Sequence, residues 1–582
     1  MYSKKHVLKT PSLLAPYFAL LYNTIKYYIS CLLKERKNMT PINLLKNKYF
    51  LYATEFFSGM SVMAVELGAS RLLAPYFSSS QVIWTIIIGT IMIAMALGNI
   101  WGGRVADKNP DPARLYKRLL LAAVWIAAIP FLGKYLIAAI SLGVALLTEK
   151  NFLVIASFLS CLIIFVFPLM LLGTVTPSLV KYTVEDLDNN GEIVGRLGAL
   201  NTIGSILGTF LPTFVTIPTV GTAATFIIFS VLLALLSLLY FISVRKKAAA
   251  CAVSFLLIGL FSISSVKYSF AFWENDLVYE GESIYNYLQV KENDESVILS
   301  TNVLAGVQSI KMKHKEFTGM YYDYALAAPY MAGAGQQADS DILILGLGTG
   351  TFASMCASYL DSPNIDGVEI DEKIARLSSQ YFDLPKSVNV HVEDGRIFLS
   401  NSDKYDVIMV DAYQDITIPF QMSTVEFFTM VKEHLKEDGV MVVNMNMHSS
   451  KEGSINDYLC DTIASVFPYA YTAKVGSGTN MELFASENGD MLTVFSEELS
   501  AIGTPALRQM MEEVEESLQP VREGSLILTD DKAPVEVLGM RVIDEIIGDE
   551  LHYYKNIIKE EGLEGLDFLV YFSYCSHKNA RR

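Results

Sequence analysis

The chain has 582 residues, 52% of them hydrophobic, and a formal net charge of −16. This length allows several domains, and the apolar excess excludes a purely soluble protein and indicates a membrane portion. The charge is divided unevenly, because residues 1–266 hold 22 basic and 10 acidic side chains (+12) and the remainder carries −28. The acidic half would repel nucleic acid, so we expect no nucleic-acid partner.

The two ends of the chain differ from the rest. Residues 1–48 are basic and enclose a semi-apolar stretch from 13 to 33. Its tyrosines and Lys26 make it a poor membrane span, so an interfacial helix is the preferred interpretation and a first transmembrane helix the alternative. Residues 551–582 form a charged, aromatic extension with no functional signal.

Residues 49–266 contain apolar segments long enough to cross a bilayer, which needs about 20 residues each. They predict a bundle of about seven helices. The predicted segments are 50–75, 82–102, 118–140, 152–173, 197–217, 222–243 and 248–266. Glycines at 198, 204 and 208 favour close contact between helices. Glu66 and Arg71 are close enough in sequence to lie near one face of the first helix.

The orientation in the membrane is not fixed by these segments. Basic loops at 104–118 and 245–247 and the basic N-terminus favour the cytoplasm, yet seven spans would then place the soluble half outside. The six cysteines are scattered and include no C-x-x-C pair, which is typical of a reducing compartment. We therefore expect a multi-pass protein of the cell membrane whose soluble half faces the cytoplasm, with the number of spans left open.

After residue 266 the pattern changes to alternating strands and helices. Residues 267–315 predict a small antiparallel sheet, and residues 316–550 predict a doubly wound, Rossmann-like α/β domain. We expect this half to have its own core and to fold without the bundle.

A glycine-rich turn marks the predicted ligand crevice. The apolar run 342–345 has the composition of a buried parallel strand, and Gly346, Gly348 and Gly350 follow it before a helix. Glycines let the backbone approach a ligand, and the helix start offers free N–H groups. About 20 residues later Glu369 ends a second strand, where a ribose diol would lie. The glycine spacing differs from a dinucleotide fingerprint and lacks a P-loop lysine, so an adenosyl-sulfonium ligand fits better.

Two further carboxylates follow predicted strands. Asp394, before Gly395, can accept a hydrogen bond from an adenine amino group. Asp411 lies at the carboxyl edge of the sheet, where ligands bind in such folds. The polar loop 412–424 has the character of a lid and carries Asp415. The seven histidines have no metal-ligand spacing, and we expect no metal.

These motifs and their order resemble the spermidine synthase (polyamine aminopropyltransferase) family over roughly residues 275–450. The matching stretches are 282–285, 306–308, Tyr322 with Leu326 and Pro329, 346–350, 368–371, 394–396 and 405–411. The whole chain resembles members fused to a transporter-like helix bundle, in which the stretch 528–536 also recurs.

The resemblance implies a class I S-adenosylmethionine-dependent transferase fold preceded by the small sheet. It implies decarboxylated S-adenosylmethionine as co-substrate, without a permanently bound cofactor, and a polyamine such as putrescine as acceptor. Asp411 would hold the amine and take its proton, and Tyr322 would share that hydrogen bond. The implied donor-binding residues are Asn286, Gly346, Gly348, Thr349, Gly350, Glu369, Asp394 and Gly395. The implied amine-binding residues are Gln308, Asp323 and Asp415.

One departure from the family keeps other functions open. Thr349 stands where soluble members have an aspartate that anchors the donor's amino group. An S-adenosylmethionine-dependent methyltransferase fused to the bundle is therefore an alternative, and a transporter with a nucleoside-sensing domain is another. The expected partners are a small polyamine and the lipid bilayer, and a homodimer is left open.

Overall fold

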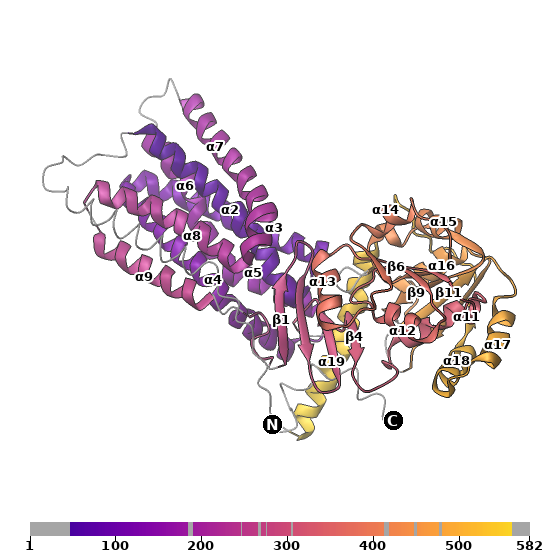
Figure 1. The fold of residues 1–582 in the computed structure, drawn as a ribbon. Coiled ribbons are helices and arrows are strands. Elements are labelled where there is room, and N and C mark those ends of the chain that lie inside the picture. Colours follow the sequence, from indigo (N-terminus) through magenta and orange to yellow (C-terminus); the bar gives the residue numbers. More distant parts are fainter. Residues whose placement is uncertain are drawn as a thin grey trace.

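The computed structural model describes residues 47–183, 190–245, 247–265, 269–274, 276–303, 306–412, 418–446, 451–476 and 480–561. The predicted interfacial helix within 1–48, Asp415 and most of the extension 551–582 lie outside these ranges. Figure 1 shows a helical bundle at one end, an α/β domain at the other, and a small sheet between them.

The bundle contains long helices with mostly apolar sequences. They are α2 (Lys48–Phe77), α3 (Gln81–Lys108), α4 (Pro112–Leu147), α5 (Phe152–Gly173), α6 (Val175–Thr183), α7 (Asn190–Leu211), η4 (Pro212–Thr216), α8 (Ile217–Ser243) and α9 (Ala248–Ser265). Within the described ranges, six helical stretches are long and apolar enough to cross a membrane by length and composition. The fifth, Asn190–Ser243, has 54 residues and includes two of the predicted segments as α7 and α8.

Helix α7 packs closely along α2, as the small residues predict. A Cβ atom on Gly204 would lie 2.1 Å from the carbonyl oxygen of Phe56, and one on Gly208 would lie 2.1 Å from that of Met60. The prediction is confirmed for these two glycines. Gly198 has no described neighbour within 4 Å of such an atom.

A four-stranded antiparallel sheet, in the order β1-β2-β3-β4, follows the bundle. Its strands are β1 (Leu277–Glu282), β2 (Tyr287–Glu292), β3 (Ser296–Ser300) and β4 (Ser309–Met312). It lies between the bundle and the α/β domain (Figure 1). The predicted small sheet is present.

The α/β domain is built on an eight-stranded sheet in the order β12-β10-β11-β9-β8-β5-β6-β7. Strands β5 (Asp341–Leu345), β6 (Asn364–Val368), β7 (Val388–His391), β8 (Tyr405–Val410) and β9 (Leu435–Met445) are parallel. Strands β10 (Tyr469–Lys474), β11 (Met481–Ser486) and β12 (Gln519–Pro520) extend it in antiparallel pairing. The Rossmann-like class is confirmed.

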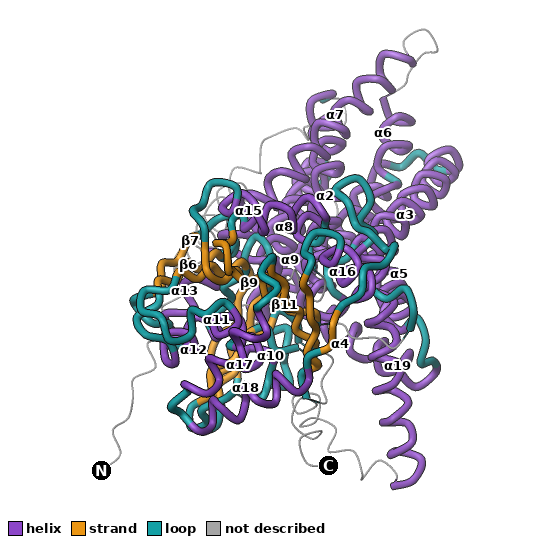
Figure 2. The backbone as a smooth tube through the Cα atoms, turned by 90° about the vertical axis from the view of Figure 1, so that its right-hand side faces the viewer, coloured by secondary structure: helices purple, strands orange, loops and turns teal. Residues whose placement is uncertain are grey.

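Helices cover both faces of this sheet (Figure 2). They are α10 (Tyr321–Ala325), α11 (Ala327–Met331), α12 (Thr351–Tyr359), α13 (Glu372–Tyr381), α14 (Gly395–Leu399), α15 (Val425–Glu433), α16 (Ile455–Ala464), α17 (Met491–Ala501) and α18 (Pro505–Ser517), with the 3-10 turn η5 (Phe420–Met422). Helix α19 (Val535–Glu561) packs instead between α16 and α5 of the bundle. Strand residues alternate between two apolar clusters, so that Val440 and Val442 face α10 and α11 while Met441 and Val443 face the opposite side. Helix α19 continues past residue 550, where the sequence suggested a boundary.

The two halves of the chain share one apolar core. A continuous cluster of buried side chains runs from Leu72 in α2 through Tyr287 in the small sheet to Leu343 in β5. Polar contacts reinforce it: the Tyr76 hydroxyl donates to the carbonyl oxygen of Phe270 (2.9 Å), and the Phe152 amide donates to Asp544 of α19 (3.1 Å). A second cluster, on the other face of the eight-stranded sheet, lies entirely within residues 310–514, so the α/β half has one core of its own and shares another with the bundle.

Arg71 connects the bundle to the small sheet. Its guanidinium donates to the carbonyl oxygens of Ser283 (3.4 Å) and Ile284. The Glu282 carboxylate accepts the Thr222 amide (2.9 Å) and hydroxyl (2.6 Å), directly after the break in α8 at Gly221. The hydrogen bonds of Arg71 and of Glu282 thus join part-buried polar groups of the bundle to polar groups of the small sheet.

We predict that a chain reduced to residues 267–582 aggregates without detergent, because truncation exposes the apolar face that packs on α2 and α5. Size-exclusion chromatography of the truncated and full-length proteins, each with and without detergent, measures this. A monodisperse truncated protein in plain buffer would contradict the shared core.

Candidate active site

The glycine turn after β5 is a close-packed loop that only glycine fits. Gly346, Gly348 and Gly350 have φ values of +93°, +55° and +84°. A Cβ atom on Gly346 would lie 2.5 Å from the carbonyl oxygen of Asp411, and one on Gly348 would lie 2.5 Å from the Ser309 hydroxyl oxygen. The loop is therefore pressed against the end of β8 on one side and against β4 on the other.

Glu369 supports this loop from the end of β6. One of its carboxylate oxygens accepts the Gly348 amide (2.9 Å) and the other accepts the Asp371 amide (2.9 Å). The side chain is buried, and burial raises the pKa of Glu369 to about 7 although the amides act in the opposite direction. This carboxylate lies at the glycine loop, where the sequence predicted it.

Thr349 presents an unsatisfied hydroxyl in the loop. Its amide donates to the Ser309 hydroxyl (3.0 Å), while its own hydroxyl is buried and has no hydrogen-bond partner among the described residues. The Thr351 hydroxyl donates to the Ile310 carbonyl (2.8 Å), which fastens the start of α12 to β4. Ser309 is a site residue that sequence reasoning missed, because a serine in a short strand carries no signal of its own.

Asn286 reaches the site from the turn between β1 and β2. Its side-chain amide lies 3.5 Å from the carboxylate of Asp371, which also accepts the Ser283 hydroxyl (2.5 Å). Asp371 caps α13 by accepting the Lys373 amide (3.0 Å). Asn286 thus lies beside Asp371, two residues after Glu369. This contact joins the small sheet to the predicted donor crevice.

Asp394 and Gly395 form the start of α14. One carboxylate oxygen of Asp394 caps this helix by accepting the amides of Arg396 (3.0 Å) and Ile397 (3.1 Å). Arg396 forms a bidentate ion pair with Asp530, in which its two terminal nitrogens lie 2.9 and 2.7 Å from the two carboxylate oxygens. The stretch 528–536 therefore buttresses this turn, a role that the sequence did not indicate.

Asp411 is held by two hydrogen bonds at the carboxyl edge of β8. One oxygen accepts the Tyr321 hydroxyl (2.7 Å) and the other accepts the Asn444 side-chain amide (2.9 Å). The predicted bond from Tyr322 is wrong, because the Tyr322 hydroxyl donates to the backbone carbonyl of Gln308 (2.9 Å). Tyr321 and Tyr322 are consecutive residues of the one-turn helix α10, and only the first points its hydroxyl at Asp411.

Asp323 does not serve the crevice. Its carboxylate is fully buried and accepts the Thr318 amide (3.0 Å), the Thr318 hydroxyl (2.8 Å) and the Gly319 amide (2.6 Å). These bonds close the turn before α10 and use both oxygens. The prediction that Asp323 binds the amine is therefore wrong. Gln308 contacts the site with its backbone carbonyl oxygen, which accepts the Tyr322 hydroxyl.

The environment of Asp411 tunes its charge. Burial raises the pKa of Asp411 to about 7, and the hydrogen bonds from Tyr321 and Asn444 partly oppose that rise. Burial also raises the pKa of Tyr321 well above its usual range, and the adjacent Asp411 charge adds to the effect. A carboxylate with a pKa near neutrality is suited to accept a proton and release it again.

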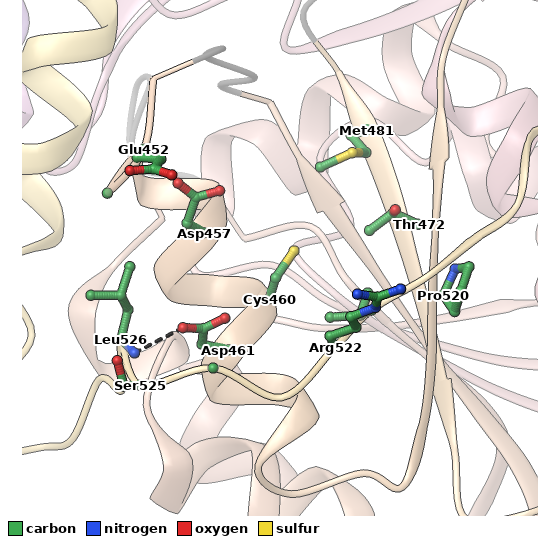
Figure 3. A pocket seen from close by; sticks show the side chains of 13 residues that line it. Glu452, Asp457, Cys460, Asp461, Thr472, Met481, Pro520, Arg522, Ser525 and Leu526 are labelled. Carbon is green, nitrogen blue, oxygen red and sulfur yellow. Dashed lines mark hydrogen bonds between the residues drawn. The ribbon is translucent and has the colours of Figure 1, made fainter.

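A separate cavity lies on the face of the sheet opposite to α10, beside β11. Figure 3 shows it between α16, the strands β10 and β11, and the segment 520–526. Asp461 accepts the Leu526 amide there (2.8 Å), and a Cβ atom on Gly524 would lie 2.1 Å from the same carboxylate. None of the 13 lining residues is a predicted site residue, and Asp461 holds the 524–526 backbone.

Residues 329–488 match the family model of the spermine/spermidine synthase domain. A probable polyamine aminopropyl transferase from Bifidobacterium longum is 54% identical over 346 residues, which cover 56% of this chain and 77% of the relative. The chain belongs to the polyamine aminopropyltransferase family.

Two further matches bear related names. The polyamine aminopropyltransferase of Vibrio vulnificus is 29% identical over 260 residues, which cover 43% of this chain and 82% of the relative. Among solved structures, a probable spermidine synthase from Corynebacterium glutamicum matches with a TM-score of 0.33 and 22% identity, and the match covers 42% of this chain and 96% of that one. The family model and the Bifidobacterium longum relative confirm the predicted enzyme class.

We predict that Glu369→Ala in this aminopropyltransferase weakens donor binding by roughly 1.5–3 kcal/mol, as expected for a hydrogen bond to a charged group. Asp394→Ala weakens it in the same direction. Isothermal titration calorimetry with decarboxylated S-adenosylmethionine measures both. Glu372→Ala is the matched control, since this carboxylate is exposed on α13 and pairs with Arg376. If donor affinity were unchanged in both Glu369→Ala and Asp394→Ala, the assignment of this crevice as the donor site would be wrong.

Proposed function

We propose that the protein is a membrane-bound aminopropyltransferase that moves an aminopropyl group from decarboxylated S-adenosylmethionine to a diamine such as putrescine. The observation that carries this proposal is Asp411, a carboxylate with a pKa of about 7 whose backbone touches the glycine loop. The donor crevice and a proton acceptor are therefore neighbours, which is the arrangement that amine alkylation by a sulfonium requires.

The adenosine half of the donor would lie along the glycine loop. Glu369, already bonded to the Gly348 amide, would accept the ribose hydroxyls, and Asp394 would accept the adenine amino group. The orphaned Thr349 hydroxyl gives the loop one further hydrogen-bonding group for the donor. Asn286 and Asp371 would close the crevice from the small sheet.

The transfer itself needs orientation, dehydration and one proton acceptor. The amine nitrogen attacks the methylene carbon next to sulfur, a C–N bond forms, and the C–S bond breaks with its electron pair passing to sulfur. The sulfonium becomes a neutral thioether, and the nitrogen loses a proton to Asp411. Tyr321 orients that carboxylate through its 2.7 Å hydrogen bond.

The bundle supports a position in the membrane. Its outward faces carry large apolar side chains, such as Met92 (64% exposed) on α3 and Ile263 (72% exposed) on α9, which a bilayer would cover. We place the α/β half in the cytoplasm, because an S-adenosyl donor is a cytoplasmic metabolite and Cys356 and Cys460, the cysteines of this half in the described ranges, are free thiols.

We predict that Asp411→Asn lowers the turnover of full-length protein by about 10²–10⁴-fold, the usual loss when a general base is removed. Donor affinity should remain within a factor of about two, because the amide keeps the shape of the carboxylate. Mass spectrometry of the products, with decarboxylated and intact S-adenosylmethionine both offered, measures the transfer. Near-normal turnover in the variant, or a methylated product from the wild type, would overturn the aminopropyl mechanism.

We predict that kcat/KM falls as the pH drops through about 7, because Asp411 must be ionised to accept the proton. Tyr321→Phe removes a hydrogen bond that lowers this pKa, so the acidic limb should move to higher pH by about 0.5–1 unit. Tyr322→Phe is the matched control, since its hydroxyl bonds the Gln308 carbonyl, and it should leave the limb in place. Equal shifts in the two variants would contradict the role assigned to Tyr321.

A further inference from the structure

Glu482, in the middle of β11, is a buried acid that the proposed mechanism does not use. Its exposed fraction is 0%, and neither carboxylate oxygen has a hydrogen-bond partner within the described ranges. An isolated buried carboxyl is unfavourable even when it is neutral, because its polar atoms have lost water without gaining a bond. Such a group in a native structure calls for a ligand or a function.

The register of the sheet places Glu482 on the face that carries the active site. Glu482 is paired with Asn444 of β9, and the Asn444 amide donates to Asp411 (2.9 Å). Phe484, two residues along the same strand, belongs to the cluster under α10, which supplies Tyr321. Glu482 therefore faces α10, whereas its neighbour Met481 lines the cavity of Figure 3 on the opposite side.

The spacing suits a ligand with two charges. Asp411 follows β8 and Glu482 lies in β11, with β9 between them, so their backbones are separated by about 10 Å. The negative charge of Asp411 raises the pKa of Glu482 beyond the rise that burial causes, so the two carboxyl groups interact across that separation. Two carboxyl groups, one hydrogen-bonded and one without a partner in the described ranges, thus lie on the same face of the sheet, the face that α10 covers.

We propose that Glu482 binds the distal ammonium group of a diamine acceptor whose other nitrogen lies at Asp411. The inference rests on the proposed transfer to an amine, and it adds the reason for choosing a diamine over a monoamine. The Asn444 side chain orients Asp411, and the Asn480 side-chain amide in turn donates to the side-chain oxygen of Asn444 (2.9 Å). These bonds, together with the pairing of β9 and β11, fix the positions of Asp411 and Glu482 relative to each other. Glu482 is an acceptor-binding residue and not a proton acceptor in the reaction.

The test compares the binding of 1,4-diaminobutane and butylamine to full-length protein in detergent by isothermal titration calorimetry. The two amines share one ammonium group and differ in the second. We expect the wild type to bind the diamine about 10–100-fold more tightly, as expected for one charged hydrogen bond. Glu482→Gln should remove most of this ratio by weakening the diamine, while butylamine changes by less than about twofold.

Two further variants separate binding from folding. Glu498→Gln is the matched control, because this glutamate on α17 also has a buried, unpartnered oxygen but lies outside the site, and it should preserve the ratio. Glu482→Leu should lose the ratio yet unfold at the same or a higher temperature, since leucine removes an unsatisfied buried group. A wild-type ratio near one, no binding of either amine, or a ratio unchanged in Glu482→Gln would overturn the inference. Binding of the diamine without any transfer would instead reject the proposed function alone.

Discussion

The contact between Gly346 and the backbone of Asp411 is the constraint on which the site depends. Because Gly346 has no side chain and a φ of +93°, the ends of the neighbouring parallel strands β5 and β8 approach within van der Waals distance. The glycine loop then meets the Glu369 carboxylate on one side and Ser309 on the other. The crevice and Asp411 thus share one rigid backbone junction, so their separation does not rely on mobile side chains.

Sequence reasoning succeeded where geometry follows from strand order. Gly346, Glu369 and Asp411 each end a parallel strand, and the carboxyl ends of parallel strands meet at one edge, so their convergence was predictable. Strand β5 includes the whole apolar run 342–345 that was expected to form a buried strand. The glycine pattern of α7 likewise fixed a contact, because close helix approach depends on residue size alone.

Sequence reasoning failed where two adjacent residues of the same type point their side chains to different partners. Nothing in a Tyr-Tyr pair tells which hydroxyl faces Asp411, since the one-turn helix α10 and its break before α11 are set by tertiary packing. Asp323 looked like a ligand residue but closes a local turn. Glu482 did carry a signal, because in β11 it alternates onto the same face as Phe484 and not onto a solvent face. The link from Arg71 to the small sheet spans 212 residues and is invisible to any local pattern.

The hydrogen bonds from Thr222 to Glu282 have a consequence for the order of synthesis. A helix that restarts after Gly221 exposes backbone N–H groups, and in a hydrocarbon environment these have no water to satisfy them. Their carboxylate partner lies 60 residues further along the chain, in the small sheet. The carboxylate that caps the restarted helix is therefore synthesised only after every helix of the bundle. The bundle reaches its final packing only after translation has passed residue 282, so the small sheet completes the helical bundle.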